Sequence, residues 1–163
     1  MAQALKLTES LAIVTYLGER YPDSALVPRS LAARAEYLRW CSFVVTELEQ
    51  PLWAIARHRF ILPKAQRLPQ VEPLEAASFG AAAGLLAERL AGRDHLLDEG
   101  FSGADILADH TPAWARSARI PLDNPVLESY LDRINADPAL IRARAREHNA
   151  SRLPPLSSPT TLP

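Results

Sequence analysis

The chain has 163 residues, 48% of them hydrophobic and 23% charged, with a formal net charge of −1. This length suggests one domain, or one and a fraction, with enough chain to bury a core without disulfides or metals. The nearly balanced charge provides no global field that would attract nucleic acid or a membrane surface. The single cysteine, Cys41, excludes an internal disulfide framework and a multi-cysteine metal site, and we expect its thiol to be buried and inert.

The sequence also bears on location and metal binding. No apolar run approaches the ~20 residues of a membrane span, and the first residues lack the basic-then-apolar order of a signal peptide. A cytoplasmic location is therefore expected. The four histidines have no spacing typical of metal ligands, so no metal site is predicted; they are His58, His95, His110 and His148.

The first predicted helix follows a short alternating segment. Residues 5–7 alternate like the end of a strand. The Thr-Glu-Ser triplet at 8–10 is typical of a helix start, capped by one of its two hydroxyls. Residues 11–21 are apolar on nearly every side, which predicts a helix covered on two faces, and Pro22 should end it.

A long second helix is predicted from Ser30, which can cap it. Apolar residues recur in it every seven positions beside a second row, as in the seam of a helical bundle. Pro51 should kink or break this helix near Gln50. The seam residues are Leu31, Leu38, Val45 and Leu52, and the adjacent row is Ala35, Ser42 and Ile55.

Three prolines between residues 64 and 73 indicate a loop, and a third helix is predicted over 74–90. Small residues along it allow another backbone to come close, and Gly92 follows as a stop signal. The small residues are Ala77, Gly80, Ala81 and Gly84.

A capping box is predicted at residues 102–105, where the hydroxyl of Ser102 and the carboxylate of Asp105 satisfy each other's backbone N–H groups. A helix should follow to about residue 119, with a kink at Pro112.

Two further helices should close the fold. Asn124-Pro125 is expected to open one that ends near residue 136, and Asp137-Pro138 a last one that ends near residue 147. The Pro-rich and Ser/Thr-rich segment at 149–163 is expected to be a disordered tail. The sequence thus predicts an all-α bundle of five to six helices.

Three segments resemble the glutathione transferase family. Residues 7–17 (LTESLAIVTYL) resemble the end of its thioredoxin-like domain, and residues 101–106 (FSGADI) resemble the start of the central helix of its all-helical domain. Residues 124–140 resemble the family's closing helices. The order and spacing of these motifs match the family over about residues 5–148.

The resemblance implies a domain organisation. Residues 1–22 would be a remnant of the thioredoxin-like domain, and residues 28–148 a glutathione transferase C-terminal-type helical bundle, followed by the tail. In the family the catalytic Ser, Tyr or Cys precedes the Glu-Ser pair, whereas only eight residues precede Glu9 here. We therefore expect an N-terminally truncated chain that is inactive alone and whose subclass chemistry is unassigned.

The resemblance also implies a ligand site at Glu9 and Ser10, the pair that holds the γ-glutamyl end of glutathione in the family. A helix N-terminus favours a carboxylate, a serine hydroxyl adds a donor, and a glutamate can accept from an ammonium group. An ordinary helix start explains the same two residues. As half of a subsite, the pair should bind the co-substrate glutathione weakly, if at all.

Four residues fall on the two helices that line the family's pocket for apolar electrophiles: Trp53, Arg57, His110 and Trp114. Aromatic residues at helical spacing are more often plain core, so this substrate-pocket assignment competes with a structural one.

Two functions remain open at this point. The first is a glutathione transferase-like protein whose intact form conjugates or reduces substrates with glutathione. The second is a non-catalytic helical interaction module. A homodimer is expected, with neither nucleic acid nor membrane as a partner. We also expect several of Leu11, Ala12, Val14 and Thr15 to face water and to drive association.

Overall fold

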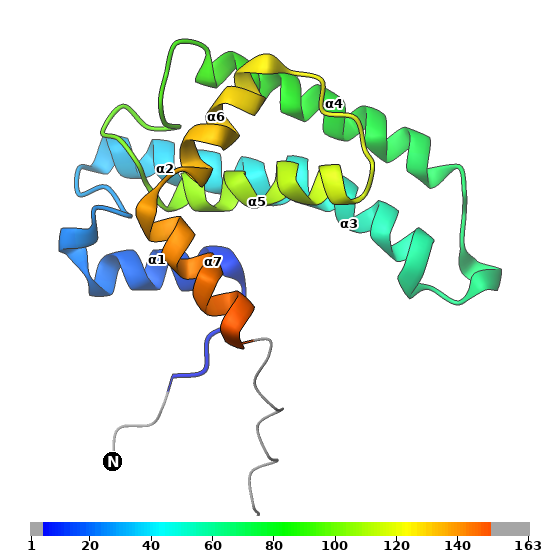
Figure 1. The fold of residues 1–163 in the computed structure, drawn as a ribbon, viewed down its shortest axis with the longest axis horizontal. Coiled ribbons are helices and arrows are strands. Elements are labelled where there is room, and N and C mark those ends of the chain that lie inside the picture. Colours follow the sequence, from blue (N-terminus) through cyan, green and yellow to red (C-terminus); the bar gives the residue numbers. More distant parts are fainter. Residues whose placement is uncertain (1–4, 151–163) are drawn as a thin grey trace, which may run out of the picture.

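The computed structural model describes residues 5–150, which form helices joined by short turns and loops (Figure 1). No strand occurs within these residues, so the alternation at 5–7 does not produce one. The α-helices are α1 (Ser10–Arg20), α2 (Leu31–Phe43), α3 (Gln50–Ala56), α4 (Val71–Leu90), α5 (Gly103–Ser117), α6 (Pro125–Asn135) and α7 (Pro138–Ala150). The shorter elements are the 3-10 turns η1 (Pro22–Ser24) and η4 (Lys64–Gln66) and the π-helical segments η2 (Val44–Glu49) and η3 (Arg57–Ile61).

The elements α2, η2, α3 and η3 follow one another without a gap and make one rod, which spans residues 31–61. Pro51 is the second residue of α3, directly after the π-helical segment η2. A proline cannot donate the usual helical hydrogen bond, and a π-helical turn is a common local adjustment to such a break. The interruption predicted near Gln50 is therefore a widened turn within a continuous rod.

The buried face of the rod differs from the predicted seam. Leu31 is 86% exposed and Leu38 46%, whereas Leu52 is buried as expected. Leu31 and Leu38 both lie in α2, before η2 begins, and the buried residues of α2 lie on another face of that helix, so the seven-residue row marks a solvent-facing side. The residues buried along the rod are Ala33, Tyr37, Trp40, Cys41, Val44, Leu48, Pro51, Leu52 and Ile55.

Helix α5 occupies the centre of the molecule, where it contacts α1, α2, α3, η2 and α6 (Figure 1). The largest fully buried side chains come from several helices around it, among them Tyr37, Phe79, Leu86, Leu127 and Tyr130. The described part of the chain thus forms one core, and the predicted all-α bundle is confirmed. With the rod counted as one helix, five helices follow α1 within residues 5–150.

Pro112 lies inside α5, yet the helix runs unbroken through it. Because proline has no N–H, the carbonyl of Ala108 loses its helical donor. The hydroxyl of the neighbouring Thr111, which is buried, donates to that carbonyl at 3.3 Å. The side chain of Thr111 thus replaces the missing backbone hydrogen bond.

The predicted capping box is confirmed at the start of α5. The Ser102 hydroxyl accepts from the backbone N–H of Ala104 at 3.2 Å, and the Asp105 carboxylate accepts from the N–H of Ser102 at 2.9 Å. Asp105 is fully buried and also accepts from the Leu96 N–H and the Tyr130 hydroxyl, each at 2.9 Å. One carboxylate therefore ties the α4–α5 loop, α5 and α6 together.

Other predicted caps are confirmed as well. The Ser30 hydroxyl accepts from the Ala33 N–H at 3.2 Å, and the Asn124 side-chain oxygen accepts from the N–H of Val126 at 3.0 Å. Asp137 likewise caps α7 by accepting from the N–H of Ala139 at 2.6 Å.

Glycines let α1 lie close against the bundle. A Cβ placed on Gly18 would come within 2.6 Å of Val27 Cγ2, and one on Gly103 would collide with Val14 Cγ1. The Thr15 and Tyr37 hydroxyls also lie 3.0 Å apart, within hydrogen-bonding distance. Helix α1 is therefore packed onto α2 and α5 and is not detached from them.

None of the helices within residues 5–150 combines the length and the apolar character that crossing a membrane requires. The tail expected at 149–163 lies outside the described residues from 151 onward.

Candidate functional site

The start of α1 carries an unusual backbone conformation at Glu9, which occupies the N-cap position with φ 70° and ψ 120°. This combination lies outside the regions that non-glycine residues ordinarily occupy and costs on the order of 1–3 kcal/mol. The Glu9 carbonyl accepts the first helical hydrogen bond, from the N–H of Ile13 at 2.9 Å. Among the described residues no side chain caps α1, so neither hydroxyl of the triplet acts as the predicted cap.

Ser10 is therefore the first residue of α1, and both Ser10 and Glu9 are exposed. The unpaired N–H groups of the first turn and the helix dipole give this end partial positive charge. The exposed carboxylate of Glu9 lies one residue away. The arrangement offers donors for a carboxylate beside an acceptor for an ammonium group.

An aromatic cluster forms where the rod faces α5. The ring of Trp114 lies 6.2 Å from that of Trp53, edge-on, and 6.1 Å from that of His110. Three of the four predicted pocket residues thus come together. Arg57, the fourth, is exposed one turn beyond Trp53 at the start of η3.

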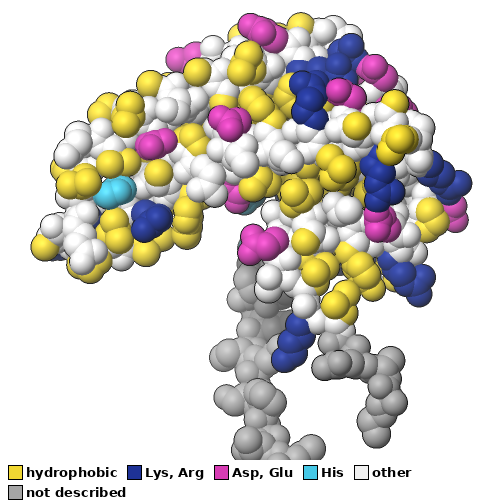
Figure 2. All heavy atoms as spheres, turned by 180° about the vertical axis from the view of Figure 1, so that it is seen from behind, with side chains coloured by type: hydrophobic (Ala, Val, Ile, Leu, Met, Phe, Trp, Pro, Cys, Tyr) yellow, Lys and Arg dark blue, Asp and Glu magenta, His cyan; other side chains and the backbone are white. Residues whose placement is uncertain are grey.

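The cluster is not a sealed core. Trp53 remains 45% exposed, and His110 is also exposed. In the space-filling view the molecule is hollowed between the end of the rod, with the loop that follows it, and the part that carries α1 (Figure 2). The N-terminal end of α1 points toward this open side, beneath α5 (Figure 1). The partly exposed rings provide an apolar surface on which a ligand could stack.

A buried charge lies next to the aromatic cluster. Asp109 on α5 is buried, and its carboxylate accepts from Arg144 of α7 at 3.0 Å and faces the Asn135 amide nitrogen at 3.5 Å. Burial raises the pKa of Asp109, while the charges of Arg144 and His110 lower it to a smaller extent. This pair fastens α7 to the centre of the bundle.

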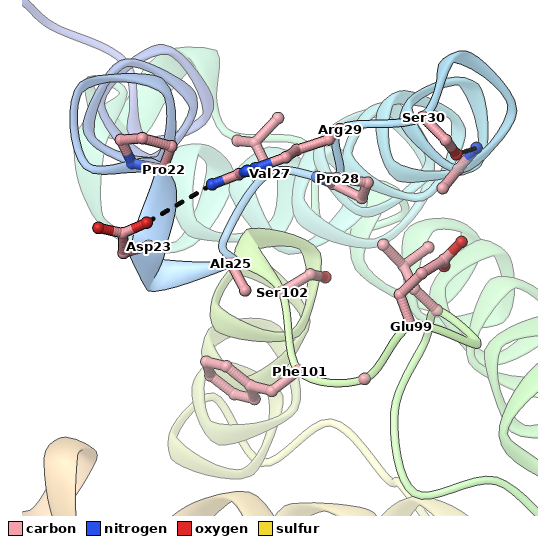
Figure 3. Close-up of a pocket in the computed structure, with 13 residues that line it drawn as sticks. Pro22, Asp23, Ala25, Val27, Pro28, Arg29, Ser30, Glu99, Phe101 and Ser102 are labelled. Atoms are coloured by element: carbon pink, nitrogen blue, oxygen red, sulfur yellow. Dashed lines mark hydrogen bonds and ion pairs between the residues drawn. The ribbon is translucent and has the colours of Figure 1, made fainter.

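A separate pocket lies between the turn after α1 and the start of α5 (Figure 3). Pro28, Val27 and Phe101 supply apolar lining, and an ion pair of 3.5 Å between the exposed Arg29 and Asp23 crosses its rim. Within residues 5–150, the buried side-chain polar atoms without a hydrogen-bond partner are Trp40 Nε1, His95 Nδ1 and Asn135 Oδ1. None of these residues lines this pocket. We therefore assign it to the packing of the turn against α5.

Cys41 is buried, as predicted, and burial raises the pKa of its thiol to about 11. A protonated, enclosed thiol is a poor nucleophile, so the residue is structural. Within residues 5–150, no three His, Cys, Asp or Glu side chains form a group that could hold a metal ion.

The sequence did not reveal a second hollow, which lies beside Trp114 and is lined by Arg59, Phe60, Trp114, Ser117, Ala118 and Arg119. Arg119 was expected to be the last residue of the helix. It instead follows the helix with a positive φ of 58°. Glycine or asparagine is the usual signal for such an end, and neither is present here.

A search of solved structures shows that this fold occurs in glutathione transferases. A sphingomonad glutathione S-transferase complexed with glutathione is 28% identical, with a TM-score of 0.77, over 91% of this chain and 71% of that one. A glutathione S-transferase from Xylella fastidiosa is 24% identical, with a TM-score of 0.79, over 91% of this chain and 73% of that one. BphK, a bacterial glutathione transferase solved as a ternary complex, is 24% identical, with a TM-score of 0.77, over 91% of this chain and 72% of that one.

The chain thus has the glutathione transferase C-terminal-type helical fold, as the resemblance implied. No protein-family model and no curated protein matched the sequence.

Proposed function

We propose that this chain provides the γ-glutamyl half-site and the helical, substrate-side domain of a glutathione transferase-like protein. The observation that carries this proposal is the strained backbone of Glu9 beside Ser10 at the start of α1. Such strain persists only where the surrounding structure enforces it, and it is concentrated at ligand sites.

The γ-glutamyl end of glutathione carries an α-carboxylate and an α-ammonium group. The carboxylate would lie against the first turn of α1 and the Ser10 hydroxyl, and the ammonium group against the Glu9 carboxylate. Two or three charge-assisted hydrogen bonds contribute about 1.5–3 kcal/mol each before the cost of ordering. The isolated chain should therefore bind glutathione with a dissociation constant in the millimolar range or weaker.

The aromatic cluster would form the apolar side of the site and accept the electrophile. Trp53, Trp114 and His110 present partly exposed rings, and Arg57 lies one turn from Trp53. In the family, the group that activates the thiol belongs to the thioredoxin-like half, of which the described residues include only α1. A free thiol with a pKa near 8.5 is mostly protonated at neutral pH, so this chain alone should not conjugate.

A second candidate, a non-catalytic interaction module, is favoured by the outward face of α1. Ile13, Tyr16 and Leu17 are exposed there at helical spacing, whereas a free surface rarely presents such a cluster without a partner. A homodimer and a cytoplasmic location form part of the proposal for both candidates.

The test is a titration of the 15N-labelled chain with glutathione, followed on the backbone amides of residues 10–12. We expect these amides to shift progressively up to tens of millimolar ligand. Ser10→Ala should weaken the effect severalfold, since it removes a donor to a charged group. Ser78→Ala, at an exposed position on α4, is the matched control and should leave the response unchanged. Shifts spread evenly over the surface, or equal responses in both variants, would contradict the proposal.

A further inference from the structure

The pocket beside Trp114 measures about 570 Å³ and lies between η3 and the end of α5. Its lining includes the rings of Trp114 and Phe60, and Phe60 is 71% exposed. Trp114 also contacts Trp53, so the pocket continues the aromatic cluster. A planar ligand that stacks on these rings would extend from the cluster into the pocket.

One of the two arginines that line the pocket is already paired. Arg59 donates from Nε to Glu72 Oε2 at 2.8 Å, and its NH2 group makes a second bond to the same carboxylate. Its third nitrogen donates to the Ala118 carbonyl at 2.5 Å. This network joins η3, α4 and the end of α5, and it leaves the Arg59 charge neutralised by Glu72.

Arg119 is placed differently. None of the ion pairs within residues 5–150 includes Arg119. Its side chain is exposed, and it lines a pocket to which Trp114 and Phe60 contribute aromatic rings.

The backbone at Arg119 adds an independent observation. The Arg119 N–H donates to the Arg116 carbonyl at 3.0 Å, and the Ile120 N–H donates to the Ala115 carbonyl at 2.9 Å. These two bonds define a helix end whose left-handed residue is usually glycine, because a Cβ is unfavourable there. This chain has an arginine at this position, where glycine would relieve the left-handed backbone.

We propose that the electrophile of the transferase-like site is a planar aromatic molecule with a carboxylate, and that Arg119 is the residue that selects the carboxylate. That this ligand is the electrophile rests on the proposed function, whereas its binding beside Arg119 does not. The aromatic ring lies against Trp114 and Phe60. The guanidinium of Arg119 donates to both oxygens of the carboxylate, a geometry that a planar fork matches.

The test compares 4-nitrobenzoate with 4-nitrobenzamide, a neutral molecule of the same shape. Binding is followed on the indole N–H signals of the three tryptophans in the 15N-labelled full chain. We expect Trp114 and Trp53 to shift while the buried Trp40 stays in place. The carboxylate should bind about five to ten times more tightly than the amide, as expected for one charge-assisted contact near water.

Two variants separate charge from folding. Arg119→Gly should reduce the preference for the carboxylate to near unity, yet raise the melting temperature by about 2–4 °C because glycine relieves the left-handed backbone. Arg119→Lys keeps the charge and should retain part of the preference. Equal affinity for both probes, an unchanged preference in Arg119→Gly, or no shift at Trp114 would overturn the proposal.

These outcomes do not depend on glutathione. A chain that binds glutathione but shows no preference for the carboxylate would contradict only the role of Arg119. A chain that prefers the carboxylate but does not bind glutathione would contradict only the half-site at α1.

Discussion

Glu9 and Arg119 both adopt backbone conformations that suit glycine better than a residue with a Cβ. Both are exposed, and each presents a charged side chain next to a proposed ligand position. In each case the backbone conformation costs stability, a compromise that recurs at functional sites.

Replacing Glu9 with glycine should raise the free energy of unfolding by about 1 kcal/mol, because it relieves the strained φ and ψ. The same change should weaken the response of residues 10–12 to glutathione, since the acceptor for the ammonium group is lost. Denaturant melts and NMR titrations measure the two effects.

Ala25 offers a matched control, since its φ of 55° is also positive and it lies away from the start of α1. Ala25→Gly should stabilise the fold by a similar amount and leave glutathione binding unchanged. A destabilised Glu9→Gly variant would show that the strain is compensated locally and has no bearing on a ligand.

Thr111 compensates for the proline within α5, and its hydroxyl can be tested directly. Thr111→Val keeps the shape but leaves the buried Ala108 carbonyl without a donor, so it should cost about 1–3 kcal/mol of unfolding free energy. Thr111→Ser keeps the hydroxyl and should cost less. Equal losses in the two variants, measured by urea denaturation, would mean that the hydrogen bond contributes little.

Helix α7 is held to the bundle by few contacts. Its described side chains from 141 to 149 are exposed, while Leu140 packs on the core and Arg144 pairs with Asp109. The pair of Arg144 with the buried Asp109 therefore helps to hold α7 against α5.

The raised pKa of Asp109 gives this pair a defined pH dependence. The carboxyl group of Asp109 has a higher pKa in the folded chain than in the unfolded chain, where the pKa is near 3.9. The stability that this shift contributes is therefore greatest below the unfolded-state pKa. It is lost as the pH rises through the folded-state pKa. The free energy of unfolding of the native chain relative to that of Asp109→Asn should accordingly increase from pH 7 to pH 4.5.

Arg144→Ala should steepen this trend, because Arg144 opposes the shift. The opposite trend, with the native chain gaining on Asp109→Asn as pH rises, would show that pairing with Arg144 outweighs burial.

The starts of α2, α5 and α6 were predicted well because their signals are local. The side chains of Ser30, Ser102 and Asn124 accept from backbone N–H groups within three residues, so the sequence contains the whole interaction. The buried face of the rod was not predicted, because α2 carries apolar residues on more than one side: Leu31 and Leu38 face solvent, while Ala33, Tyr37, Trp40 and Cys41 face the core.

Only part of the candidate site could be predicted from the sequence. The aromatic cluster follows from helical spacing and the resemblance, whereas the strain at Glu9 and the left-handed Arg119 depend on tertiary contacts that spacing does not encode. The whole pocket beside Trp114 was missed because it joins η3 to the far end of α5.

At the scale of the molecule, α1 exposes a different face from the one predicted. Leu11 packs on the core, and Val14 and Thr15 face α5 and α2, so they do not lie open to water. The packing allowed by Gly18 and Gly103 turns the opposite side outward. The exposed large apolar residues on α1 are Ile13, Tyr16 and Leu17.

This outward face should drive association of the chain. Tyr16→Lys combined with Leu17→Glu should lower the mass measured by light scattering at high concentration, because burial of a large apolar side chain contributes about 1.5–3 kcal/mol. The exposed Leu74 on α4 provides the control, and Leu74→Lys should have no such effect if the contact is made through α1. A native chain that stays monomeric at the same concentration would contradict the expected association.

The central claim is that α1 recognises the γ-glutamyl end of glutathione, and two fragments of that tripeptide test it most directly. γ-Glutamylcysteine contains the amino-acid end, whereas cysteinylglycine lacks it. With the 15N-labelled chain, γ-glutamylcysteine should shift the amides of residues 10–12 along the same path as glutathione, and cysteinylglycine should leave them in place. Equal shifts with both fragments, or shifts with cysteinylglycine alone, would contradict the claim.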